Sequence, residues 1–156
     1  MSKRVVIGAL VSGMLAGVVA TVPMLAHADE SATGKVQIVR VEYNVRGVDT
    51  PANAYLESVR VKNLGADQDM TNWTVEDSTG HAYTFPAGYV LKANQTVNVR
   101  TGVKPTTLTG WWADSAANLY WNRTHHMYGN SSDSVTLENN GVRVDRVAWN
   151  DFTILP

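Results

Sequence analysis

The sequence predicts an all-β domain, built as a two-layer sandwich or a barrel. After residue 35 the chain contains at least seven short runs in which apolar and polar residues alternate. Turn-forming residues separate these runs at intervals of roughly 8–12 residues, which is typical of such folds. No window longer than about ten residues in this region has the periodicity of an amphipathic helix. One hairpin, within residues 119–149, is especially clear, and the rest of the chain is organised around it.

Two alternating runs of this hairpin are joined by Asn139-Asn140-Gly141. The Asn-Gly pair favours the positive φ angles of a tight hairpin turn. In the second run, Val142 and Val144 share a face, but the apolar phase changes between Val144 and Val147. Side chains repeat every two residues along a strand, so both apolar pairs face inward only if one extra residue is accommodated. We therefore predict a β-bulge near Asp145-Arg146.

Further strands are predicted by runs of the same kind. Their expected positions are residues 36–43, 56–63, 73–77, 82–85, 89–91 and 96–101. In the second of these, Val59 and Val61 are expected to face the core, whereas Glu57, Arg60 and Lys62 are expected mostly outside. The residues between these runs have the composition of loops, and residues 102–117 form the least regular stretch.

The N-terminus has the three parts of a secretory signal peptide. Lys3-Arg4 precedes an apolar stretch from Val5 to Val22, and Ala26-His27-Ala28 supplies a small-x-small cleavage site. An apolar segment of this length nearly reaches that of a membrane-spanning helix, but its three glycines and the cleavage site favour removal. We expect cleavage after Ala28, secretion of the mature chain and no stable membrane anchor.

The chain accordingly divides into a signal peptide helix (residues 1–28), a short linker (29–35) and one domain (36–156). It contains no cysteine, so core packing alone must stabilise the exported domain. Removing the signal peptide takes away two of the thirteen basic residues and none of the fourteen acidic ones, which leaves a net charge of −3. This balance gives no reason to expect a nucleic-acid partner, since such proteins usually carry a basic stripe. Stacking and apolar contact are expected to dominate binding.

Short segments in a fixed order carry a family resemblance. They are residues 41–44, 57–63, 70–77, 83–86, 97–102, 119–121, 130–137 and 141–145. Together they resemble the lamin tail domain, an immunoglobulin-like β-sandwich found in nuclear lamins and in secreted bacterial proteins. Asn72 and Ala93-Asn94 stand where this family often has Gly and Pro-Gly. These are plausible turn substitutions, because Asn tolerates positive φ nearly as well as Gly does.

The resemblance implies an interaction module rather than an enzyme. In bacteria such domains often accompany extracellular hydrolases or nucleases, and no catalytic residues are known to travel with the domain. The expected partner is an extracellular protein or a cell-envelope glycan, and no cofactor is expected. The oligomeric state is left open.

Trp111 and Trp112 are the candidate partner-binding residues. They lie in the least regular stretch, where two adjacent aromatic side chains are difficult to bury together. An exposed ring there would serve as a stacking platform, as in carbohydrate-binding modules, and this class of function is one alternative. In another interpretation, the pair pins its loop onto the sandwich. The remaining tryptophans, Trp73, Trp121 and Trp149, are expected to fill the core.

A different class of function is a small extracellular hydrolase or nuclease with a metal site near His125 and His126. Possible further ligands are His81, Asp114 and Asp133. Neighbouring strand residues face opposite sides, and no H-x-H or H-x-x-x-H spacing occurs, so a non-ligating histidine pair is favoured.

Other chemistry has still weaker support in the sequence. Four acids could bind calcium in a loop: Asp67, Asp69, Asp77 and Asp133. The chain lacks the D-x-D-x-D-G run of known calcium loops and the G-x-S-x-G elbow of serine hydrolases.

Overall fold

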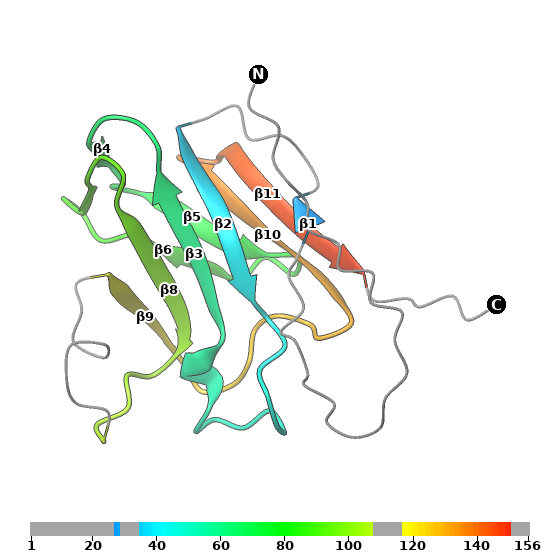
Figure 1. Cartoon of the computed structure of the whole chain (residues 1–156). Coiled ribbons are helices and arrows are strands. Elements are labelled where there is room, and N and C mark those ends of the chain that lie inside the picture. The colour runs from blue at the N-terminus through cyan, green and yellow to red at the C-terminus, as the bar shows by residue number, and fades with distance from the viewer. Residues whose placement is uncertain (1–26, 29–34, 108–116, 151–156) are drawn as a thin grey trace, which may run out of the picture.

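The structure, a computed structural model, describes residues 27–28, 35–107 and 117–150 (Figure 1). Its strands are β1 (His27–Ala28), β2 (Val36–Glu42), β3 (Ser58–Asn63), β4 (Gln68–Asp69), β5 (Trp73–Asp77), β6 (Ala82–Thr84), β7 (Val90–Leu91), β8 (Thr96–Gly102), β9 (Asn118–Arg123), β10 (Ser132–Asn139) and β11 (Val142–Asn150). One short 3-10 helix, η1 (Ala54–Leu56), precedes β3. The prediction of an all-β fold is confirmed for the described residues.

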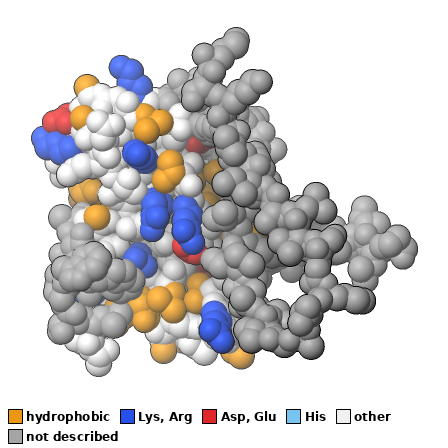
Figure 2. All heavy atoms as spheres, in the orientation of Figure 1, with side chains coloured by type: hydrophobic (Ala, Val, Ile, Leu, Met, Phe, Trp, Pro, Cys, Tyr) orange, Lys and Arg blue, Asp and Glu red, His pale blue; other side chains and the backbone are white. Residues whose placement is uncertain are grey.

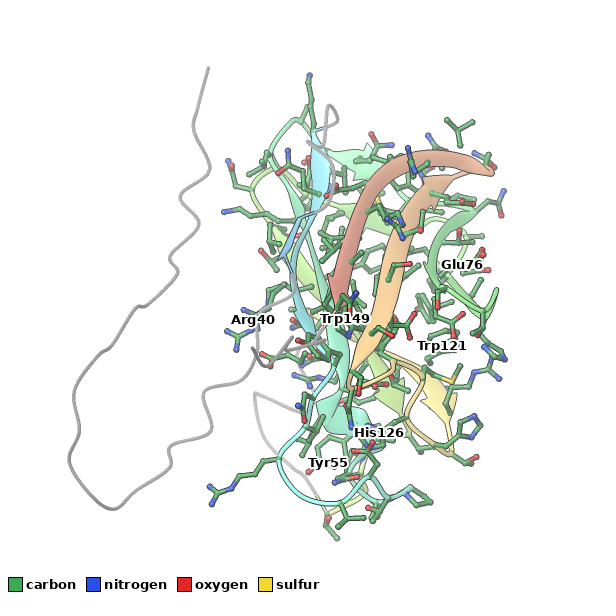
Figure 3. The ribbon with its side chains drawn as sticks, turned by 90° about the vertical axis from the view of Figure 1, so that its right-hand side faces the viewer. Arg40, Tyr55, Glu76, Trp121, His126 and Trp149 are labelled. Carbon is green, nitrogen blue, oxygen red and sulfur yellow. The ribbon has the colours of Figure 1, made fainter. Side chains whose placement is uncertain are left out.

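Two sheets face each other and form the sandwich. The first has the order β1-β11-β10-β5-β6, the second has the order β2-β3-β8-β9, and β4 and β7 form a small separate pair. Neighbouring strands are antiparallel except β8 and β9, which are parallel. In Figure 1 the four-stranded sheet lies in front, and the 90° view of Figure 3 shows the two layers on edge.

The hairpin of β10 and β11 has the predicted turn and a bulge close to the predicted place. Asn140 and Gly141 both have positive φ, at 50° and 77°. Leu137 pairs with Asp145 and Glu138 pairs with Arg143, so Val144 is the extra residue, one position before the predicted pair. The prediction that Val142 faces the core is wrong, because its side chain is 67% exposed at the end of the strand.

A second bulge occurs in β2, and sequence analysis did not predict it. Ile38 pairs with Val61 and Arg40 pairs with Arg60, so Val39 is the extra residue in this strand. The buried carboxylate of Asp145 accepts a hydrogen bond from the Ile38 amide at 2.8 Å. The bulged strand of one sheet therefore holds the bulged strand of the other through a single carboxylate.

The core lies between the two sheets. Trp73 and Trp149 are buried there as predicted, and Trp149 stacks on the Tyr43 ring with 4.2 Å between the centroids. The predicted burial of Trp121 is only partly met: its ring is half-buried at the margin of the core, edge-on to Tyr83.

Two further expectations concern loops. Asn72 and Asn94 have φ angles of 63° and 61°, so both adopt the left-handed conformation. In this conformation asparagine was expected to substitute for the glycine that the family often has. The predicted strand 56–63 begins later than expected, because Leu56 belongs to η1 and β3 starts at Ser58.

Several expectations fall on residues that the structure does not describe. The signal peptide up to residue 26, most of the linker, the segment 108–116 and residues 151–156 lie outside the described parts of the chain. Within those parts, no helix has the length and apolar character needed to cross a membrane.

Candidate functional site

The connections at one end of the sandwich converge on the start of β3. These connections are the loop between β2 and β3, the end of β8, and the segment 124–131 between β9 and β10. Gly102, at the end of β8, lies against η1 so closely that a Cβ atom would be 2.3 Å from the Tyr55 backbone nitrogen. Glycine is required there because the two backbones leave no room for a side chain. Figure 3 shows Tyr55 and His126 together at this end.

Glu57 is the buried centre of this loop cluster. Its carboxylate accepts hydrogen bonds from the backbone amides of Met127 (2.9 Å) and Tyr128 (3.1 Å), which lie seventy residues further along the chain. Burial raises the pKa of the Glu57 carboxyl to about 7, although the two amide donors act in the opposite direction. The sequence prediction that Glu57 faces outward is wrong: its side chain is fully buried.

His126 lies beside Glu57, and its side chain is only 7% exposed. The Asn53 amide nitrogen donates to the Val48 carbonyl, so the Asn53 Oδ1 atom is an acceptor, and the His126 Nε2 atom donates to it at 2.9 Å. The His126 Nδ1 atom is 3.6 Å from the Glu57 carboxylate and 3.7 Å from that of Asp49, beyond hydrogen-bonding distance. Both nitrogens of this ring are thus directed at groups of the connection between β2 and β3.

A shallow hollow of about 270 Å³ lies over this cluster. It is lined by Asp49, Thr50, Pro51, His125 and His126. The Asp49 carboxylate also accepts a hydrogen bond from the amide of Asn130, at 3.0 Å. The hollow therefore lies between two loops that are bonded to each other.

Although His125 and His126 both line the hollow, the histidines proposed as metal ligands have separate hydrogen-bond partners. His81 bonds to Asp77 in the turn between β5 and β6, His126 bonds to Asn53, and His125 is exposed beside Thr124. Asp114, another proposed ligand, lies outside the described residues. In the described part of the chain, no group of three or more His, Cys, Asp or Glu side chains could hold a metal ion.

The acids considered for calcium each serve a local structure instead. Asp67 pairs with Lys92, and Asp69 accepts hydrogen bonds from Thr71. Asp77 accepts from Thr79 and His81 in its own turn.

Asp133 links two loops, because it accepts hydrogen bonds from the amides of Ser78 and Gly129. Its carboxylate therefore has structural partners on both sides. The candidate partner-binding residues Trp111 and Trp112 lie outside the described parts of the chain, in the connection between β8 and β9.

Two packed sheets, with loops bonded together at one end, define an immunoglobulin-like β-sandwich. The chain belongs to the lamin tail domain family: the family model, described as Lamin Tail Domain, matches residues 29–151. A comparison with curated proteins found no match. The family resemblance inferred from the sequence is thereby confirmed.

Proposed function

We propose that this protein is a secreted, non-catalytic binding module that engages an extracellular protein or a cell-envelope polymer. The observation that carries the proposal is the way Glu57 ties the 124–131 segment to the start of β3 through two backbone amides. A carboxylate used in this way makes the loop end rigid, and rigid loops at the end of a sandwich are a common surface for recognition.

The hydrolase alternative requires titratable groups that are free to react with a substrate. At this end of the molecule, Glu57 and His126 direct their polar atoms at the loops themselves. Their arrangement favours a structural role, and membership of the lamin tail domain family supports the same interpretation.

The partner surface is proposed to include the connection that carries Trp111 and Trp112. This connection leaves β8 after Gly102, at the loop end just described. Tryptophan is over-represented where binding energy is concentrated, because its large flat ring buries much area with few rotatable bonds.

We expect Trp111→Ala and Trp112→Ala each to weaken binding to isolated envelope material by about tenfold or more, as hot-spot losses of about 2 kcal/mol imply. The urea midpoint should stay at the wild-type value. A suitable control is Val103→Ala, which removes a 53% exposed apolar side chain from the same connection. Normal binding by both tryptophan variants, or unfolding of both, would show that the pair is structural.

A further inference from the structure

We propose that the outer face of the sheet β2-β3-β8-β9 binds an extended anionic glycan polymer, mainly through Arg40, Arg60 and Lys62. The proposal rests on the binding function proposed above and specifies the chemistry of the partner. It also assigns a role to the outer face of this sheet, which is not part of the loop end described above.

The charged residues of this face stand in adjacent cross-strand rows. Arg40 pairs with Arg60, and the row continues through Asn98 to Asn118, so that it crosses all four strands. Lys62 lies in the next row, opposite Thr96. Figure 2, which views this sheet from outside, shows Lys and Arg side chains gathered in the middle of the face.

A further cation, Arg100, lies in the row on the other side of Arg60 from Lys62 and is largely buried along the sheet. Burial lowers the pKa of its guanidinium, and the positive charge of Arg60 acts in the same direction. The Arg100 Nε atom donates to the Asn118 amide at 2.8 Å, so this residue extends the positive charge of the face while forming part of its framework.

Arg40 and Arg60 form a like-charge pair at directly opposed positions, where Cβ atoms are roughly 4.5–5.5 Å apart and like charges destabilise a sheet. Glu42 forms an ion pair with Arg40. Arg60 donates to the neutral Asn98 amide at 2.9 Å, and among the described residues neither Arg60 nor Lys62 forms an ion pair. Glu42 therefore offsets one member of the like-charge pair, and a cost that the fold leaves only partly compensated in this way is typical of a functional surface.

The bulge in β2 produces this arrangement. Because Val39 is an extra residue, Val39 and Arg40 both lie opposite Arg60 on the outer side, and Val39 is 46% exposed. Figure 3 shows Arg40 directed away from both layers of the sandwich. The bulge is fixed by the bond from the Ile38 amide to Asp145, so the outward position of Arg40 is built into the fold.

The outer face of the other sheet provides an internal comparison. There Glu138 lies opposite Arg143, and Thr136 lies between Glu76 and Arg146. Opposite charges therefore alternate on that face, as is usual for a solvated sheet surface. Of the two outer faces, only that of the β2-β3-β8-β9 sheet concentrates positive charge.

The flat shape and the chemistry of the face favour an extended anionic glycan over other polyanions. Guanidinium groups bind carboxylate and phosphate in a planar, bidentate manner. An interface with a folded protein normally has an apolar or aromatic core. Among the central cations of this face, Val39 is the apolar side chain. Duplex DNA requires an element that enters a groove, and single strands require several stacking rings. Along its described rows the face offers one ring, that of Tyr120.

The test uses polygalacturonate, which has one carboxylate per sugar, and its uncharged methyl ester as a matched probe. We expect the mature protein to bind polygalacturonate with an affinity that falls as the salt concentration is raised. It should not bind the methyl ester. The double variant Arg60→Gln/Lys62→Gln should bind about tenfold more weakly, as the loss of two exposed charge contacts implies. Arg143→Gln is the control, because it removes a positive charge from the outer face of the other sheet and should leave affinity unchanged.

Urea midpoints of all variants should match the wild type, and Arg40→Gln provides a second route if the double variant unfolds. Equal weakening by Arg143→Gln, or binding of the ester, would overturn the proposal, as would tighter binding of duplex DNA or polyglutamate at equal charge concentration. The two proposals can fail separately. Tryptophan variants that bind envelope material normally contradict the loop surface, and arginine variants that bind polygalacturonate normally contradict the sheet face.

Discussion

At the scale of single residues, the proton on Glu57 is the most consequential feature of the loop end. An ordinary glutamic acid has a pKa of 4.5, and burial raises that of Glu57 to about 7. Between these two pH values the folded chain binds a proton that the unfolded chain releases. The free energy of unfolding must therefore fall as the pH rises through this window, by at most about 3 kcal/mol for this group. Below it both states are protonated, and above it the loss is complete.

We expect urea unfolding of the wild type to show this loss between pH 4.5 and 7 and Glu57→Gln to reduce the slope. The variant should also be less stable at pH 5, because the glutamine amide has one acceptor oxygen, so the backbone amide of either Met127 or Tyr128 loses its acceptor. Asp77 does not interfere. Burial raises its pKa, but hydrogen bonds from His81 and Thr79 outweigh that effect and lower it, so the stability contributed by Asp77 is lost only at more acidic pH. Glu76→Gln is the control, and an unchanged slope in Glu57→Gln would contradict the assignment.

A buried acid is also where residue-level prediction failed, because Glu57 was expected to face outward; Asp77 and Asp145 are buried as well, and no orientation was predicted for them. Glu57 has the same strand parity as Val59 and Val61, Asp77 follows Val75, and Asp145 precedes Val147, so each acid is the end member of an inward-facing run. The inward parity of these acids was visible in the sequence. Because burying a charged group normally costs free energy, an acid is not expected at an inward position. For Glu57 and Asp145, what decides the outcome is the presence of distant backbone amides, which no local pattern reveals, whereas Asp77 is satisfied by Thr79 and His81 of its own turn.

At the scale of elements, the two bulges and the carboxylate between them control how the sheets meet. Asp145 enters the space between the layers because Val144 shifts the phase of β11, and its Oδ2 atom satisfies the Ile38 amide freed by the bulge in β2. Removing the acceptor leaves a buried donor without a partner, which typically costs about 1–3 kcal/mol.

Asp145→Ala should therefore lower the free energy of unfolding by about 2 kcal/mol or more, and Asp145→Asn should lower it less because one acceptor oxygen remains. Hydrogen exchange of the Ile38 amide should accelerate in the alanine variant more than global unfolding explains. The exposed acid Asp69 provides the control through Asp69→Ala. If the Ile38 amide kept its wild-type protection, the carboxylate would not be what holds the bulge.

Local elements were predicted well and non-local ones were not. The β10–β11 hairpin follows from neighbouring residues, namely an Asn-Gly turn and a change of apolar phase, and both appear in the structure. The bulge in β2, the parallel pairing of β8 with β9 and the small β4–β7 sheet depend on partners distant in the chain. Periodicity along one strand carries no information about which strand lies beside it.

At the scale of the whole molecule, net charge was a misleading guide to the partner. The expected charge of −3 for the mature chain suggested that salt-sensitive binding is unimportant. The topology instead places Arg40, Arg60 and Lys62 on neighbouring positions of one sheet, while acids are paired with cations on the other. Recognition depends on this local distribution, which is known only once the strand order is known.

The last prediction concerns where the mature chain begins. Cleavage after Ala28 would remove the whole of β1, which pairs His27 and Ala28 with Ala148 and Val147 of β11. Two residues contribute few ladder bonds, each worth about 1 kcal/mol net. The newly exposed edge of β11 would still be protected by its bulge and by Arg143 and Arg146, which oppose pairing with another chain. The family match covers residues 29–151 and so does not include β1.

We therefore expect mass spectrometry of secreted material to find a chain that starts at Asp29. Purified chains starting at Ala26 and at Asp29 should unfold within about 1 kcal/mol of each other. Recovery of only the intact chain from membranes would contradict cleavage itself. Aggregation or unfolding of the Asp29 chain alone would place β1 in the mature domain and the cleavage site upstream of residue 27, because β11 would then need its two-residue neighbour to remain a protected strand.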